Sequence, residues 1–264
     1  MKANIQDIMF PVKEVPAIGI DIHNSKGEIQ DTGYKFIMRE DTGDILSCMT
    51  NNYKLINNST ILEKSDNIIS KEGGTIKEVQ TFGRGARSLV KYEFSKHKIT
   101  ISNGDICTPE IVGQNSYDGT VGLNIIAGAF RLVCTNGLVI GVVADKYRNK
   151  HIIQNMELQD IEGVIEETIK KTKRIMKDEF PVIHGTKVQQ SHILDILKMF
   201  PLQSSEYITN LLLAENPNNL WDLLNVATNV ATHGMDRKAE STHKLEARIY
   251  AKICKMAKVH IANA

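Results

Sequence analysis

The chain has 264 residues, of which 42% are hydrophobic and 24% are charged, and its formal net charge is +1. This composition excludes a disordered chain, and the length is sufficient for one large domain or two modest ones with a buried core. The near-neutral net charge gives no indication of a nucleic-acid partner.

Several classes of protein are disfavoured by what the sequence lacks. No apolar run approaches the roughly 20 residues of a membrane helix, and residues 1–19 lack the apolar segment of a secretory signal. The four cysteines are scattered without a CxxC pair, so neither a disulfide framework nor a zinc knuckle is indicated. We therefore expect a cytoplasmic protein without a membrane segment.

The first half of the sequence predicts strands and turns. Residues 34–41 and 42–50 form a hairpin with a turn at Asp41–Asp44, and a helix follows Asn57 and Asn58, capped by Ser59 or Thr60. Residues 73–102 predict two or three strands. Their turn at Gly83–Gly85 requires positive φ angles. Residues 111–145 continue the sheet pattern.

The second half predicts helices. The expected segments are 157–180, ended by Pro181, then 187–200, ended by Pro201, and finally 204–215, 219–234 and 241–262. The predicted fold class is therefore α+β. A sheet-rich, mostly antiparallel portion at residues 1–150 carries a basic hairpin. A helical portion at residues 151–264 packs on it as one compact unit, and essentially only helix is expected after residue 156.

No motif identifies a catalytic site, a metal or a cofactor. The histidines lack HxxxH and HExxH spacing, and no GxGxxG or phosphate-loop pattern is present. Cys134 is more simply a packing residue than a nucleophile. Asp105, Asn115 and Asp118 could hold a cation, although residues 115–119 are more simply a turn. We expect no enzyme, and keep open a site around these four residues.

A basic hairpin is the first candidate binding element. Six basic and two acidic residues lie between residues 75 and 100, and Phe82 and Tyr92 alternate with Arg84, Arg87 and Lys91. Single-stranded nucleic acid is held by cations on its phosphates and by aromatic rings under its bases. The alternative is a solvated hairpin with its aromatic residues in the core.

Two further basic elements are candidates. Arg131, between apolar residues of a predicted strand, is a candidate phosphate ligand. In the last helix, Lys244, Arg248 and Lys252 recur at a spacing of four residues and form one charged stripe beside an apolar face. Such a stripe is usually solvated. The scarcity of acidic neighbours instead favours a phosphate or an acidic partner.

Four blocks of sequence, taken in order, resemble the phage/plasmid-like protein family, which is catalogued as a domain of unknown function. The resemblance extends over residues 34–235. The blocks contain Asp44 with Tyr53–Asn57, then Asn115–Gly119, then Arg131, Cys134 and Asn136, and lastly Trp221, Asn225 and His233.

This resemblance implies a protein of phages, prophages or plasmids. The order of a sheet, a basic hairpin and helices is also similar to that of the single-strand annealing recombinases of phages, by analogy alone. The hypothesis is a DNA-metabolism protein in the host cytoplasm that binds single-stranded DNA, with annealing activity and self-association as further expectations. The alternatives are a protein-interaction module, such as an inhibitor of host defence or of a host factor, and an enzyme of unknown chemistry.

Overall fold

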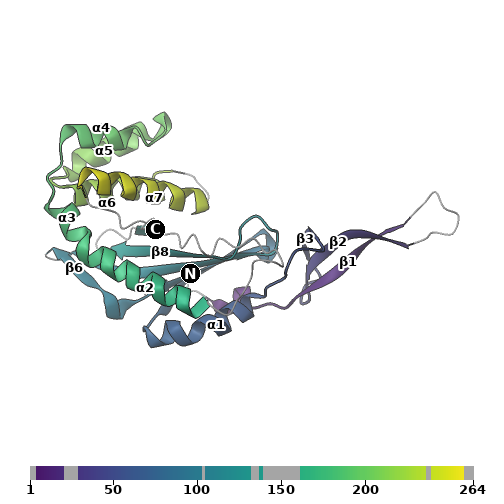
Figure 1. The fold of residues 1–264 in the computed structure, drawn as a ribbon. Helices are drawn as coiled ribbons and strands as arrows, with labels where there is room; N and C mark the ends of the chain where they lie inside the picture. The colour runs from purple at the N-terminus through teal and green to yellow at the C-terminus, as the bar shows by residue number, and fades with distance from the viewer. Residues whose placement is uncertain are drawn as a thin grey trace. The chain divides into compact units, whose positions relative to one another are not determined.

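A computed structural model describes residues 4–20, 29–102, 105–131, 137–138, 161–235 and 239–258 (Figure 1). Strands fill the N-terminal half and helices the C-terminal half, which confirms the predicted α+β class. The chain divides into two compact units. The first unit contains Met1–Tyr92, Val112–Ile125 and Ala144–Glu166, and the second contains Glu93–Ile111, Ile126–Val143 and Glu167–Ala264. The units thus interleave along the chain, whereas the predicted boundary at residue 150 lies outside the described residues.

A three-stranded antiparallel sheet belongs to the first unit. After the short 3-10 helix η1 (Ile5–Ile8), β1 (Val12–Ile20) pairs with β2 (Ile29–Arg39), and β2 pairs with β3 (Ile45–Thr50). Figure 1 shows β1 and β2 as a long hairpin. The predicted β2–β3 hairpin is confirmed, with Gly43 at a φ of 76° in its turn. The sequence did not predict β1.

The basic hairpin forms as predicted. Helix α1 (Asn58–Lys71) comes first and starts after Asn57, so the predicted caps Ser59 and Thr60 are wrong. Strands β4 (Thr75–Phe82) and β5 (Arg87–Glu93) follow, joined by the turn η2 (Gly83–Gly85). All three residues of this turn have positive φ angles, as expected for a tight glycine turn.

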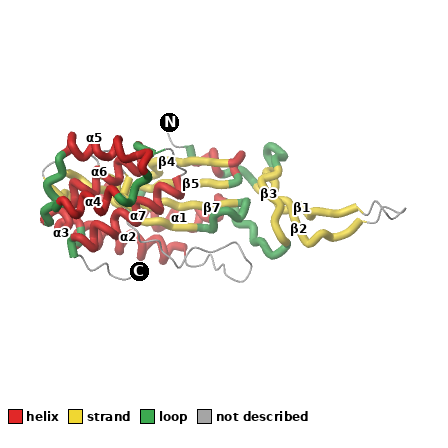
Figure 2. The backbone as a smooth tube through the Cα atoms, turned by 90° about the horizontal axis from the view of Figure 1, so that it is seen from above, coloured by secondary structure: helices red, strands yellow, loops and turns green. Residues whose placement is uncertain are grey.

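A six-stranded sheet contains these two strands. Its remaining members are β6 (Ile99–Ser102), which follows the 3-10 turn η3 (Ser95–His97), then β7 (Asp105–Ser116), β8 (Asn124–Arg131) and β9 (Gly137–Leu138). The order is β4-β5-β7-β8-β9, with β6 paired to β7. Figure 2 shows β4, β5 and β7 side by side. The pairs β6–β7 and β8–β9 are antiparallel.

The described residues after 156 form helices and no named strand. The helices are α2 (Ile161–Asp178), α3 (Phe180–Gly185), α4 (Gln190–Leu197), η7 (Leu202–Ser204), α5 (Ser205–Glu215), α6 (Leu220–His233) and α7 (Ala239–Met256). Pro181 lies in the first turn of α3, where its missing N–H is tolerated. It therefore follows the end of α2 and lies at the beginning of α3. Within the described parts of the chain, no helix has the length and apolarity needed to cross a membrane.

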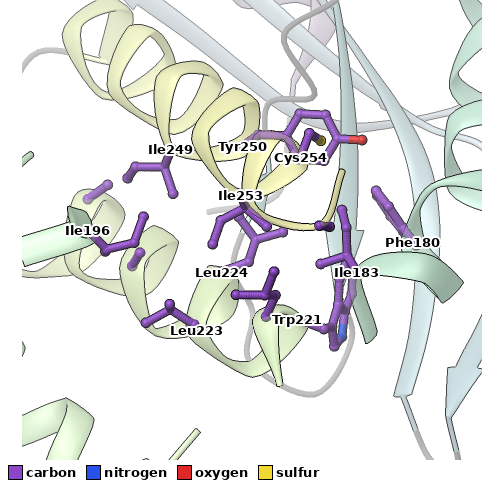
Figure 3. Close-up of a cluster of buried hydrophobic side chains, with 14 of the residues drawn as sticks. Phe180, Ile183, Ile196, Trp221, Leu223, Leu224, Ile249, Tyr250, Ile253 and Cys254 are labelled. Atoms are coloured by element: carbon purple, nitrogen blue, oxygen red, sulfur yellow. The ribbon is translucent and has the colours of Figure 1, made fainter. Parts of the chain in front are cut away.

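The core of the second unit is built around α6, whose side chains are buried along most of its length. Figure 3 shows side chains from α3, α4, α6 and α7 gathered in this core. The rings of Phe180 and Trp221 lie 4.6 Å apart between centroids. Trp221 Nε1 also donates a hydrogen bond of 2.7 Å to Asp105 Oδ2. The indole thus fills the core and satisfies a buried carboxylate.

Candidate nucleic-acid interface

The turn between β4 and β5 exposes one aromatic ring and one arginine. Phe82, at the end of β4, is 39% exposed, and the side chain of Arg84 is 75% exposed. Gly85 holds the turn against Phe10: a Cβ at Gly85 would lie 2.5 Å from Phe10 Cζ, and its φ of 101° disfavours other residues. We call Phe82, Arg84 and Arg87 the hairpin tip.

Arg87, one of the three residues of the hairpin tip, contacts the turn that follows β7. Its guanidinium carbon lies 5.7 Å from the centroid of the Phe82 ring, within reach of a cation–π interaction. Its Nε lies 3.6 Å from Asp118 Oδ2 and has no hydrogen-bond partner although it is buried. Phe82 and Arg87 therefore form a small cationic-aromatic platform at the molecular surface.

A third arginine supports the tip and was not predicted. Arg39 Nη1 donates to the carbonyl oxygen of Arg84 at 3.1 Å, and its guanidinium lies 3.7 Å over the ring of Phe10. Arg39 also donates two hydrogen bonds to Asp41, at 2.9 and 2.6 Å. This hydrogen bonding holds the pKa of the Asp41 carboxyl below its usual value. The role of Arg39 is evident only from the tertiary structure, in which the end of β2 lies close to the β4–β5 turn.

Charge at the tip is balanced. Arg84 Nη1 lies 3.3 Å from Asp44 Oδ1, so Arg39, Arg84 and Arg87 each face an aspartate. The Arg84 pair is solvent-exposed, and such pairs contribute little to stability. The pairing with Asp44 thus leaves the Arg84 guanidinium accessible to solvent.

The other two predicted residues of the hairpin are occupied within the fold. Lys91 Nζ lies 3.2 Å from Glu78 Oε2. Tyr92 is only 8% exposed, and its hydroxyl hydrogen-bonds with Ser65. The predicted stacking role of Tyr92 is therefore wrong, because its ring faces the protein interior. Strand alternation explains this placement, since Arg87 and Lys91 share one face of β5 and Tyr92 lies on the other.

A buried polar network lies behind the tip and centres on Asn58. Its backbone N–H donates to the Tyr117 hydroxyl at 3.0 Å, and its Nδ2 donates to the carbonyl oxygen of Ile8 at 3.0 Å. Its Oδ1 accepts hydrogen bonds from Asn115 Nδ2 at 2.8 Å and from Ser88 Oγ at 3.1 Å. We call these five residues the Asn58 network. It joins η1, α1, β5 and β7.

The same network connects the separate sequence blocks of the family resemblance. The Tyr53 hydroxyl donates to the carbonyl oxygen of Ser116 at 3.0 Å, and the backbone N–H of Tyr117 donates to the carbonyl oxygen of Ala86 at 2.7 Å. Phe10, Tyr53 and Tyr117 also belong to one buried apolar cluster. The block at residues 53–57 and the block at residues 115–119 therefore meet beside the hairpin tip.

The segment after β7 is a turn and not a cation site. Asp118 Oδ1 accepts a hydrogen bond of 3.0 Å from the backbone N–H of Thr120, and Gly119 has a φ of 68°. This is the side-chain-to-backbone turn expected for Asp followed by Gly. Among the described residues, no group of three or more His, Cys, Asp or Glu side chains could hold a metal ion.

The residues of the enzymatic alternative have structural partners where they are described. Asp105 binds the indole of Trp221, Asp118 faces Arg87, and Asn115 donates to Asn58 and to the carbonyl oxygen of Ile56. Cys134 lies outside the described residues. The described members thus have roles in supporting the fold.

Helix α7, in the second unit, has the charged face and the apolar face that its sequence predicts. Lys244 and Arg248 are exposed, whereas Leu245, Ile249 and Ile253 are buried. Lys252 Nζ lies 2.7 Å from Asp195 Oδ2 of α4, so this cation is paired within the protein. Binding by this stripe stays a prediction. Arg131 is the last residue of β8, and its side chain lies outside the described residues, as does Asn136.

The architecture defines an α+β protein in which a buried asparagine network supports an exposed arginine-aromatic tip. The chain belongs to the family described as domain of unknown function (DUF932), which matches residues 45–251. This match contains Phe82, Arg84, Arg87 and most of the Asn58 network. No solved structure matches the chain.

Proposed function

We propose that this protein binds single-stranded DNA at the hairpin tip. The observation that carries the proposal is the exposed Phe82 ring with the Arg87 guanidinium 5.7 Å from its centroid, beside the exposed side chain of Arg84. A base stacks on the aromatic face while the guanidinium groups bind the flanking phosphates. Aromatic stacking tolerates any base, so this site binds without sequence preference.

The charge balance at the tip determines how this binding depends on salt. Three aspartates face the three arginines, so a strand must compete with carboxylates for each guanidinium. We therefore infer modest affinity, with few phosphate contacts and a shallow salt dependence. Phe82 supplies a larger share of the binding free energy than it would at a strongly basic surface.

The biological setting that we propose is DNA metabolism of a phage or plasmid. It rests on the order of the four sequence blocks and on the analogy with annealing recombinases. Annealing needs a protein that holds a strand by its backbone and leaves its bases able to pair. A small tip of this kind suits that task best when several copies act together, so self-association belongs to the proposal. No nucleotide cofactor is part of it.

Fluorescence anisotropy with a labelled oligo-dT strand, titrated over a salt series, tests the proposal. Phe82→Ala should weaken binding by about 1–3 kcal/mol and leave the salt slope nearly unchanged, because stacking releases no ions. Arg84→Ala with Arg87→Ala should make the log–log slope shallower by about 1.4, at roughly 0.7 for each phosphate contact.

A matched control removes two cations from exposed positions of the second unit. Lys177→Ala with Lys198→Ala, on α2 and next to α4, changes the net charge by the same amount. It should leave both affinity and slope unchanged if binding is local to the tip. Equal losses in both double variants would show that the oligonucleotide responds only to net charge, and would refute the assigned site.

The second candidate is a protein-interaction module, and the β1–β2 hairpin favours it. Ile18, Ile20 and Ile29, at the far end of that hairpin, are all exposed. Exposed apolar side chains that lie together typically mark a protein contact. Light scattering of the wild type and of Ile18→Ser with Ile29→Ser tests this candidate. A wild-type oligomer that dissociates in the variant would show that these residues contact a second copy of the chain, and identical masses refute self-association through these residues.

A further inference from the structure

A cavity in the first unit lies between α1, η1 and the beginning of β4. Its volume is about 660 Å³, within the range of about 300–1,000 Å³ typical of small-molecule sites. It is distinct from the hairpin tip, since it contains neither Phe82 nor an arginine. Its walls are formed by Ile5, Met9, Leu62, Glu63, Ser65, Asp66, Ile69, Ser70, Gly74, Thr75, Ile76 and Tyr92.

The wall is mainly apolar. Met9 and Ile76 are among the exposed large hydrophobic residues of the chain, and both line this cavity. Ile69, from α1, is buried behind them. Apolar side chains left open to solvent in a concave surface gain free energy when a ligand covers them, at roughly 25 cal/mol for each Å² buried. The cavity is therefore shaped for an apolar body.

The charged side chains of the wall are all acidic. Glu63 and Asp66 contribute carboxylates one turn apart on α1, and the lining residues include no lysine, arginine or histidine. The hydroxyls of Ser65 and Tyr92 lie at the same wall and hydrogen-bond with each other. Burial and the Asp66 charge, against the hydrogen bond with Ser65, raise the pKa of Tyr92 to about 12.

We propose that this cavity binds a small organic cation with an apolar body. The apolar wall takes up the body, and the two carboxylates face the positive charge. An anionic ligand of the same shape would meet two like charges and no compensating cation. Because Glu63 and Asp66 are exposed, their attraction is screened by salt, and selectivity for the cation should be largest at low ionic strength.

Two probe ions distinguish the contribution of shape to binding from the contribution of charge. Tetraphenylphosphonium and tetraphenylborate have nearly the same size and apolar surface but opposite charge. We expect tetraphenylphosphonium to bind with a stoichiometry of one and to shift the NMR signal of the Met9 methyl group in methyl-labelled protein. Met9→Leu assigns that signal. Met199, which packs against the core of the second unit, should keep its signal unchanged and serves as the internal control.

Two variants test the charges without altering the core. Glu63→Gln with Asp66→Asn should raise the Kd for tetraphenylphosphonium roughly threefold to tenfold at low salt, because two exposed charges are removed. Ile76→Arg places a cation at an exposed wall position, and should weaken tetraphenylphosphonium binding while strengthening tetraphenylborate binding. Unchanged melting temperatures would show that these variants keep the fold.

The proposal is overturned by either of two results. One is a Met9 methyl signal that tetraphenylphosphonium does not shift at millimolar concentration. The other is equal affinity for both ions, unchanged in the doubly neutralised variant, which would reveal an apolar surface without selectivity for charge. Loss of DNA binding in the Phe82→Ala protein has no bearing on either result, since the two sites share no residue.

Discussion

Trp221 Nε1 donates a hydrogen bond of 2.7 Å to Oδ2 of Asp105, across 116 residues of sequence. Both side chains are buried, at the centre of the core of the second unit. The bond joins the beginning of β7 to the first turn of α6. A buried carboxylate is costly unless it is hydrogen-bonded, so this contact specifies which helix covers this end of the strand.

Trp221→Phe keeps an aromatic ring and removes the donor. We expect the free energy of unfolding to fall by about 2–4 kcal/mol, from the lost hydrogen bond and the smaller ring. Urea denaturation followed by circular dichroism measures it. A double-mutant cycle with Asp105→Ala, which removes the acceptor, isolates the bond, and a coupling energy near zero would show that only packing is lost.

Asn58→Ala should destabilise the first unit strongly. The change removes the buried partner of the Ile8 carbonyl oxygen and of the Ser88 hydroxyl, and one of the two acceptors of Asn115 Nδ2, at a cost of about 3 kcal/mol. Asn67→Ala, at an exposed position of the same helix, should stay within about 0.5 kcal/mol of the wild type. Similar urea midpoints for the two variants would disprove a structural role for the network.

Asp44→Asn should strengthen DNA binding. It removes the carboxylate that faces Arg84 at 3.3 Å and so frees the guanidinium for a phosphate. Because the pair is exposed, the gain should be modest, about twofold to fivefold in Kd at low salt. Anisotropy with labelled oligo-dT measures the gain, and Asp178→Asn, at an exposed position of α2, is the matched control. A Kd that is unaffected by the loss of Asp44 would mean that Arg84 does not contact the strand.

Stability should fall as the pH rises from about 10 to 12. Burial raises the pKa of Tyr92 and of Tyr117 to about 12 from an ordinary value of 10.0. In this window the unfolded tyrosines lose their protons while the folded ones keep them, so higher pH favours the unfolded chain. Each tyrosine contributes a slope of at most about 1.4 kcal/mol per pH unit.

Urea denaturation across this pH window measures the tyrosine effect. Tyr92→Phe and Tyr117→Phe should each flatten the dependence on pH, although both also lose a hydrogen bond at neutral pH. Tyr34→Phe, at an exposed position, is the control and should leave the slope unchanged. A wild-type stability that is constant up to pH about 12 would contradict the assignment.

Cysteine labelling should be selective. Cys48 is exposed, whereas Cys107 and Cys254 are buried. Burial and the nearby Glu179 carboxylate, against the hydrogen bond with Tyr250, raise the pKa of the Cys254 thiol to about 12. At pH about 8 only about one such thiol in 10⁴ is ionised. Mass spectrometry after iodoacetamide treatment should find Cys48 modified and Cys254 intact, and rapid labelling of Cys254 would contradict its burial.

Much of the secondary structure could be predicted because its signals are local. The turn at Gly83–Gly85 and the turn after Asn115 follow from glycine and aspartate chemistry within a few residues. The charged and apolar faces of α7 follow from helical periodicity alone. Strand β1 was missed because Pro16 and Gly19 disfavour a strand, and Pro16 is tolerated because β1 is an edge strand of its sheet.

The sequence by itself determined most of the elements, the α+β class and the charge and aromatic content of the hairpin, since each depends on neighbours along the chain. Only the tertiary structure decided which faces of β4 and β5 are covered, and so that Tyr92 is buried while Phe82 is exposed. It also decided that Arg39 supports the tip and that Asn58 meets Asn115. These contacts depend on which strands pair and which helix covers them. Turn chemistry leaves a pattern of fixed spacing in the sequence, whereas long-range packing leaves none.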